Sequence, residues 1–390
     1  MKRTYLIALL LAVSAFSYGQ NRVESVLNEI EQNNPALKAA SAEVDEEMLA
    51  NRSEALLANP EVEFNYLLGA ENIGNRHDVR VSQSFDIPTV TGMRARKTEY
   101  KNDLSRLKYE SERLSIIQEA RALCVDLAYY NSLLNELTTH LSASNSLVGS
   151  YEKRLKAGDA TVLDLNKAKL HLASVQGELN MAEAGRQSSL SRLKALNGGK
   201  EIAFDATCEE IMESLPSDFE TWFAEASEKN PVLEYVRKEL ELGRKQLAID
   251  KASRLPDLSV GYMSEIRTAE KFRGVTLGVS IPLWSGANKV RQSRAGVVAA
   301  ETRLNAAEND FFHQLQDRYR QASLMKANSE MMRSSLSGTD NREFLISALK
   351  KGEISMIDYL VEYDLYYEAL KQTLEAERGY LHSLAALKVF

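Results

Sequence analysis

The sequence predicts a mainly α-helical protein with a smaller β component, built from two tandem copies of one structural unit. Three observations lead to this fold class. Prolines and glycines recur at a near-constant offset, short segments alternate apolar and polar residues, and long segments carry apolar residues at helical spacing. The composition agrees, because alanine, leucine, glutamate, lysine and serine are abundant while the 390 residues include 7 prolines and 19 glycines.

The repeat is visible in the prolines. Pro35, Pro60 and Pro88 pair with Pro231, Pro256 and Pro282, at offsets of 196, 196 and 194 residues. Chance would not hold this register over so long a stretch, so we predict a first repeat at 21–197, a polar linker at 198–217 and a second repeat at 218–390. The seventh proline, Pro216, lies in the linker.

Each predicted repeat has the same internal order. A helix at 34–58 precedes two alternating segments, EVEFNYLL and VRVSQSFDI, which predict a β-hairpin at 61–87, with AENIGNRHD as its loop. The second repeat has its hairpin at 257–282. Long antiparallel helices follow in each copy, with turns, or tips, near 158 and 352. A heptad seam that begins at Leu165 and Ala168 indicates that they form coiled coils.

The two tips carry matching motifs, KAGDATVLDL and KKGEISMIDY. In each, a glycine can adopt positive φ and end one helix, a hydroxyl residue can cap the next helix, and an aspartate at its third position can complete a capping box. The matching residues are Gly158 and Gly352, Thr161 and Ser355, and Asp164 and Asp358.

The first 20 residues predict a secretory signal peptide. Lys2 and Arg3 precede an apolar run, and small and polar residues follow it. No later apolar run reaches the ~18 residues of a membrane-spanning helix. An exported chain of this kind would therefore enter a membrane through its strands.

The four strands leave two alternatives open. Their length suits a tilted crossing of a bilayer, and their alternation is typical of membrane barrels. Four strands cannot close a barrel, and an open sheet would leave unsatisfied backbone groups in lipid. Either the strands form a soluble sheet, or several chains share one barrel above a tube of coiled-coil helices.

Several functional classes find no support in the sequence. The formal net charge of −7 argues against a general nucleic-acid binder, and no enzyme motif or cofactor-binding motif is present. Cys124 and Cys208 are interpreted as structural or incidental. The tyrosines near the second tip, Tyr359, Tyr363, Tyr366 and Tyr367, are expected to pack between helices. The histidines, His77, His140, His171, His313 and His382, are isolated in the sequence, so no metal ligand is assigned.

The repeated order of helix, hairpin and long helices resembles the TolC-type outer-membrane efflux protein family. The most specific stretches are RLKAGDATVLDLNKAKLHL and ALKKGEISMIDYLVEYDLY, and NPEVEFNY, VRVSQSFDIP and VTLGVSIPLWSG are similar to the heavy-metal cation efflux branch. The resemblance implies a homotrimer with a shared 12-stranded β-barrel in outer-membrane lipid and an α-barrel in the periplasm. It also implies a periplasmic adaptor protein and a proton-driven inner-membrane pump of the RND type. The chain would be a passive duct for the substrates of that pump, either heavy-metal cations or drugs.

The resemblance also implies roles at the tips. Asp164 and Asp358 would be periplasmic gate residues, and the adaptor would dock on Ala157, Gly158, Asp159, Lys351, Gly352 and Glu353. The chain departs from some members at Val361, where they have a second acid, and at Leu349 and Ile354, where they have a tyrosine and an arginine that tie the tip shut. Glu362 is a candidate substitute for the missing acid.

Two other functions stay open at this point. A type I protein-secretion conduit would differ from an efflux channel in its partners alone. A soluble periplasmic coiled-coil adaptor or scaffold would use the strands as a small soluble sheet, and it would not need the whole unit to be duplicated in register.

Overall fold

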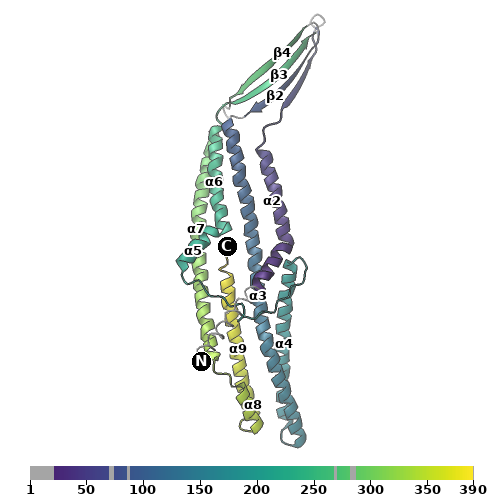
Figure 1. Ribbon diagram of the computed structural model, residues 1–390, viewed down its shortest axis with the longest axis vertical. Coiled ribbons are helices and arrows are strands. Elements are labelled where there is room, and N and C mark those ends of the chain that lie inside the picture. Colours follow the sequence, from purple (N-terminus) through teal and green to yellow (C-terminus); the bar gives the residue numbers. More distant parts are fainter. Residues whose placement is uncertain (1–21, 70–73, 86–87, 268–269, 282–286, 390) are drawn as a thin grey trace, which may run out of the picture. The chain divides into compact units, whose positions relative to one another are not determined.

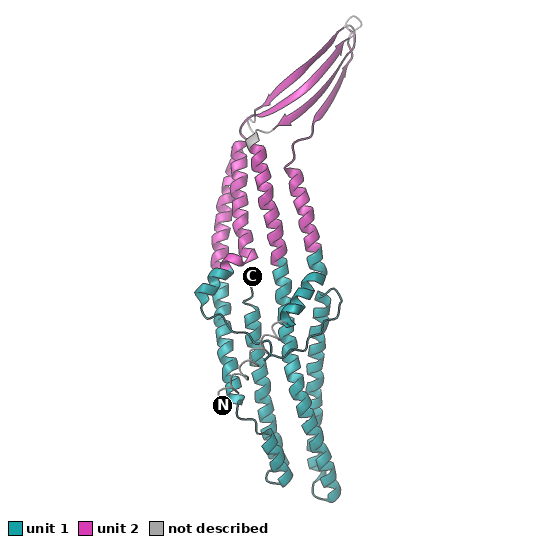
Figure 2. Cartoon of the chain, in the orientation of Figure 1, with its two compact units in different colours: residues 1–38, 112–226, 312–390 teal, residues 39–111, 227–311 magenta. Residues whose placement is uncertain are grey.

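The computed structural model describes residues 22–69, 74–85, 88–267, 270–281 and 287–389. They form two compact units (Figure 2). Unit 1 comprises residues 1–38, 112–226 and 312–390, and unit 2 comprises residues 39–111 and 227–311. Each unit takes segments from both halves of the chain, so the predicted repeat boundaries stay a prediction. The expected signal peptide lies outside the described residues.

The elements follow one order in both halves of the chain (Figure 1). After a helical segment at 22–33, the first half has α2 (Pro35–Glu54), β1 (Glu61–Leu67), β2 (Arg76–Phe85), α3 (Pro88–Ala157) and α4 (Val162–Leu196). The second half begins with α5 (Phe219–Lys229) and continues with α6 (Pro231–Ala252), β3 (Asp257–Arg267), β4 (Lys271–Ser280), α7 (Ala287–Leu336), α8 (Arg342–Lys351) and α9 (Met356–Ala385).

The helices that precede the hairpins begin alike. The side-chain oxygen of Asn34 accepts a hydrogen bond from the backbone N–H of Leu37 at 3.1 Å, and that of Asn230 accepts one from Leu233 at 3.0 Å. Each asparagine caps a helix whose first residue is a proline, which has no N–H to lose and a suitable φ. The first of these helices, α2, ends at Glu54, before the expected residue 58.

The strands form one antiparallel sheet in unit 2, in the order β1-β2-β3-β4. The central pairing of β2 with β3 joins the two halves of the chain, with Val81 opposite Tyr262. His77 and Asp78 were expected in the hairpin loop, but β2 begins at Arg76 and includes both. Register explains the correction, because His77 pairs with Tyr66 and the two rings stack at 6.2 Å.

One face of this sheet is apolar, and we call it the apolar face. Residues paired across antiparallel strands point to the same side, and along one strand alternate residues do so. Twelve large apolar side chains on this side are between 39% and 80% exposed. They are Val62, Phe64, Tyr66, Val79, Val81, Phe85, Leu258, Val260, Tyr262, Val275, Leu277 and Val279.

The opposite face of the sheet carries a charged network. Arg76 lies 3.2 Å from both Asp78 and Glu265, and Arg267 lies 2.8 Å from Glu265. Asp78 and Glu265 are buried, so these carboxylates depend on their arginine partners for compensation. The alternation predicted from the sequence therefore separates an apolar face from a polar face.

The helices of unit 2 are joined by polar contacts along their length. Lys101 on α3 pairs with Glu54 on α2 at 2.5 Å, and Lys238 on α6 pairs with Asp103 on α3 at 3.1 Å.

No helix among the described residues combines the length and the apolar composition needed to cross a bilayer.

The linker between the halves packs closely in unit 1, although its composition is polar. Ile202, Phe204 and Ile211 are buried, and Asn131 on α3 donates from its side-chain amide to the carbonyl of Ala206 at 2.9 Å. The two cysteines, Cys124 and Cys208, are free and buried, and burial raises the pKa of each thiol to about 12.

The long helices differ between the two halves. The first, α3, runs unbroken through 70 residues. In the second half, α7 ends at Leu336 and residues 337–341 break the helix, with Gly338 at φ 86. The short helix α8 follows and buries no residue of its own. Arg342 at its start lies 2.7 Å from Asp340 and 3.1 Å from Glu136 on α3, and it stacks on the ring of Tyr366.

Candidate functional site

The first tip connects α3 to α4 in unit 1. Gly158 has φ +83, and its N–H donates to the carbonyl of Leu155 at 3.1 Å. The N–H of Asp159 donates to the carbonyl of Arg154 at 2.8 Å. This pair of bonds is a Schellman motif, which ends a helix at a residue in the left-handed conformation.

A capping box then starts α4. The backbone N–H of Thr161 donates to Asp164 Oδ2 at 3.1 Å, and the N–H of Asp164 donates to Thr161 Oγ1 at 3.2 Å. The threonine hydroxyl also donates to the same carboxylate at 2.7 Å. These bonds from Thr161, first from its hydroxyl and then from its backbone, hold the pKa of the Asp164 carboxyl below its ordinary value.

The second tip repeats this geometry between α8 and α9. Gly352 has φ +76, and its N–H and that of Glu353 donate to the carbonyls of Leu349 and Ala348 at 3.2 and 2.9 Å. Ser355 and Asp358 form the capping box, with 3.2 Å from the serine N–H to Asp358 Oδ2 and 3.1 Å for the reciprocal bond. The matching sequence motifs thus produce matching backbone turns.

A common hydrophobic cluster holds the two tips together, and we call it the tip core. Its buried members come from α3, α4 and α9, so it joins the first helix pair to the last helix. They are Leu147, Tyr151, Leu165, Ala168, Met356, Tyr359 and Tyr363. Leu349 and Ile354 pack against this cluster. They are the two positions named above as departures from the efflux protein pattern.

A cleft of about 1180 Å³ lies beside the tip core and is lined by both tips. Arg154 and Asp159 line it from the first tip, and Lys351 and Gly352 line it from the second. Tyr151 and Tyr359 supply aromatic walls, and the guanidinium of Arg154 lies 5.1 Å from the centre of the Tyr151 ring. Such a mixture of apolar walls and a few charged groups suits a protein segment better than a small polar solute.

The expected site residues differ in their exposure. Asp358 is exposed and Asp164 is half-buried. The expected docking residues Ala157, Gly158, Asp159, Lys351, Gly352 and Glu353 are all exposed. Lys351 and Glu353 pair with each other at 3.9 Å, across Gly352. The expected tyrosine packing is confirmed for Tyr359, Tyr363 and Tyr367, which are buried.

The structure brings together residues that the sequence analysis treated as isolated. His140 on α3 and His171 on α4 have their ring centres 5.2 Å apart, and Asp364 on α9 lies beside them. They are 31 and 193 positions apart, so no local spacing could have revealed the group. Burial first, and then the neighbouring His171, lowers the pKa of His140 to about 4.

Comparison with known proteins relates the first half of the chain to one protein family. The model of the outer membrane efflux protein family matches residues 26–199, which include the first tip. The match covers 26–199 of the 390 residues, so the first half of the chain is similar to this family.

Similar proteins include a sequence relative and solved structures of the same fold. It is 28% identical over 132 residues to the cobalt-zinc-cadmium resistance protein CzcC of Cupriavidus metallidurans, an alignment that covers 34% of this chain and 31% of CzcC. The outer membrane channel CmeC of Campylobacter jejuni has a TM-score of 0.70 at 15% identity, with 94% of this chain and 84% of CmeC covered. The outer membrane protein VceC of Vibrio cholerae has a TM-score of 0.69 at 16% identity, covering 94% and 93%.

The left-handed conformation of Gly158 leads us to expect opposite effects when glycine is replaced by alanine at two different sites. Gly158→Ala should lower the free energy of unfolding of unit 1 by about 1–2 kcal/mol, because a Cβ is strained at positive φ even in open space. Gly149→Ala should raise it by up to about 1 kcal/mol, because Gly149 lies inside α3 with nothing nearby. Denaturant unfolding followed by circular dichroism measures both, and equal effects would contradict this account of the turn.

The capping box predicts a pH-dependent contribution from Asp164. Its folded-state pKa lies below the ordinary 3.8, so the carboxylate stabilises the fold fully above that value and loses its effect as the pH falls through the folded-state pKa. The melting temperature of wild type should exceed that of Asp164→Ala at pH 7, and the gap should narrow below about pH 4. Asp159→Ala, at an exposed carboxylate that caps neither helix, serves as the control. A gap that widens in acid would contradict the prediction.

Proposed function

We propose that this chain is the outer-membrane channel of a tripartite efflux system. It serves as a passive exit duct for solutes that an inner-membrane pump delivers through a periplasmic adaptor. The apolar face of the sheet is the observation that carries the proposal. Its side chains are exposed to a degree that is unusual for a water-soluble sheet, whose exposed side would be polar.

The sheet also has two open edges. Both β1 and β4 pair on one side only, which leaves a row of backbone donors and acceptors at each edge. In lipid these groups must be satisfied by other strands. Three copies of a four-stranded sheet supply the twelve strands of a closed barrel, so the proposal includes a homotrimer with the charged network toward the lumen.

The tips support the remaining parts of the proposal. The cleft between them exposes backbone, basic and acidic groups together, which suits the docking of a periplasmic adaptor on Ala157, Gly158 and Asp159 and on Lys351, Gly352 and Glu353. The exposed Asp358 and the half-buried Asp164 stand at the helix starts of the two tips. In a trimer each would occur three times and form acidic rings, which we assign as the periplasmic gate.

The cargo is proposed by chemical class. CzcC is named for cobalt, zinc and cadmium resistance, and the aligned part spans about a third of that protein. Heavy-metal cations are therefore the proposed substrates, with a proton-driven RND pump as the energy source. Acidic gate rings would admit cations and select weakly among them, because the carboxylates are solvated.

Arginine placed on the two sides of β4 tests the barrel. Leu277→Arg lies on the apolar face and should cost about 2–4 kcal/mol if that face meets lipid, so little protein should reach the outer membrane. Thr276→Arg, one residue away on the polar face, should be assembled normally. Membrane fractionation with an alkaline wash measures both. If the wash releases the wild-type protein, the chain is a periplasmic scaffold instead of a barrel.

Neutralising Asp358 tests the gate. Asp358→Asn keeps an oxygen that can accept the capping hydrogen bonds, but it removes one charge per chain. Single-channel conductance in planar bilayers should rise and cation preference should fall relative to wild type. Asp159→Asn, at an exposed carboxylate of the other tip, is the control. An unchanged conductance with Asp358→Asn would limit Asp358 to helix capping and leave the channel proposal standing.

A further inference from the structure

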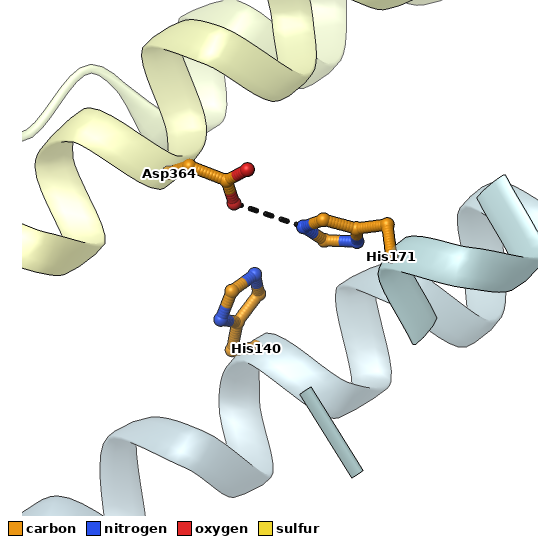
Figure 3. A group of neighbouring side chains, drawn as sticks. All are labelled: His140, His171 and Asp364. Carbon is orange, nitrogen blue, oxygen red and sulfur yellow. Dashed lines mark hydrogen bonds and ion pairs between the residues drawn. The ribbon is translucent and has the colours of Figure 1, made fainter. Parts of the chain in front are cut away.

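Three side chains from three helices point toward one another in unit 1 (Figure 3). They are His140 on α3, His171 on α4 and Asp364 on α9. Each offers one nitrogen or oxygen atom, and these atoms all lie within 4.8 Å of one another. Two imidazoles and one carboxylate are the donor set that divalent transition metals take in proteins.

The buried histidine, His140, makes no side-chain hydrogen bond to the described residues. His140 is 4% exposed, and neither of its ring nitrogens has a hydrogen-bond partner. The rings of Tyr363 and Tyr367 lie 4.9 and 4.3 Å from it and supply apolar packing. A buried polar group without a hydrogen-bond partner lowers the stability of the fold. The ring of His140 therefore either destabilises the protein or binds a ligand.

The second histidine is oriented as metal ligands usually are. Its Nδ1 lies 3.2 Å from the hydroxyl of the buried Ser144, and its Nε2 lies 2.9 Å from Asp364 Oδ1. A hydroxyl can donate or accept. The Ser144 hydroxyl can therefore accept a hydrogen bond from Nδ1–H, which leaves the Nε2 lone pair free for a cation, as is usual for histidines at metal sites.

We propose that His140, His171 and Asp364 bind one divalent transition-metal cation per chain, of the Zn²⁺ class. Three protein ligands leave the fourth tetrahedral position to water, as in sites where the ion or a ligand exchanges. The Asp364 side chain is 55% exposed while that of His171 is 11% exposed, so an ion can reach the ligands from the solvent side of α9.

The position of the site gives the cation a structural effect. Tyr363 both packs on His140 and belongs to the tip core, so the ligands lie next to the cluster that joins the two tips. A bound cation would tie α9 to α3 and α4, and the fold would gain stability as the cation concentration rises. The inference concerns a resident ion and does not rest on the proposed channel function.

Zinc titration of the full-length protein tests the site. The protein is purified without a polyhistidine tag, and Zn²⁺ binding is measured against a chromophoric chelator. Wild type should bind one Zn²⁺ per chain, and its melting temperature should rise with Zn²⁺. His171→Ala should abolish this binding, and Asp364→Asn, which is nearly isosteric, should weaken it by at least about tenfold.

The control is His313→Ala, which removes an exposed histidine of α7 and should leave binding unchanged. Circular dichroism shows that each variant is folded. The inference is overturned if folded wild type binds no Zn²⁺, or if His171→Ala and Asp364→Asn bind it as wild type does. A sample that conducts in bilayers but binds no Zn²⁺ overturns this inference alone, and the reverse result overturns the channel alone.

Discussion

An exposed apolar face on an open sheet is the constraint on which the proposed assembly depends. No part of the chain that the structure describes covers this face, and there the edge strands β1 and β4 each pair with a neighbour on one side. In water the exposed apolar face is unfavourable, and in lipid the unpaired backbone groups of the edge strands are unfavourable. A single copy of the sheet is therefore unstable in either environment. Partners that close the sheet inside a bilayer remove both penalties. The charged pairs of the opposite face, such as Arg76 with Glu265, then have an aqueous interior in which to lie.

The two tips meet a different requirement, which is to end one helix and begin the next. Each long helix must reverse direction, and its last carbonyls and the next helix's first N–H groups need partners. A positive-φ glycine, a hydroxyl residue and an aspartate satisfy them within a single turn, and the chain uses this solution twice. Because the capping is local, the outward side chains of each tip remain available for contacts with another protein.

Local patterns explain which parts of the fold could be predicted from the sequence. Strand alternation, helix length and the capping boxes depend on neighbours within a few residues, and these were expected at nearly the right positions. Features that depend on residues far away in the sequence were not predicted. The start of β2 is extended by pairing with Tyr66, and the linker is buried by contacts such as that of Asn131 with Ala206. The group of His140, His171 and Asp364 needs three helices to be placed first.

The break between α7 and α8 gives the two halves different sensitivities to ionic strength. The first tip ends an unbroken helix of 70 residues that is anchored by buried side chains. The second tip follows a helix of 10 residues that buries none, and Arg342 holds it through Asp340, Glu136 and the face of Tyr366. Mobile ions screen such charge pairs where solvent reaches them, whereas they leave apolar packing largely intact. Two turns with the same backbone geometry therefore share the tip core but differ in their remaining support, and added salt weakens the charge pairs that only the second turn depends on.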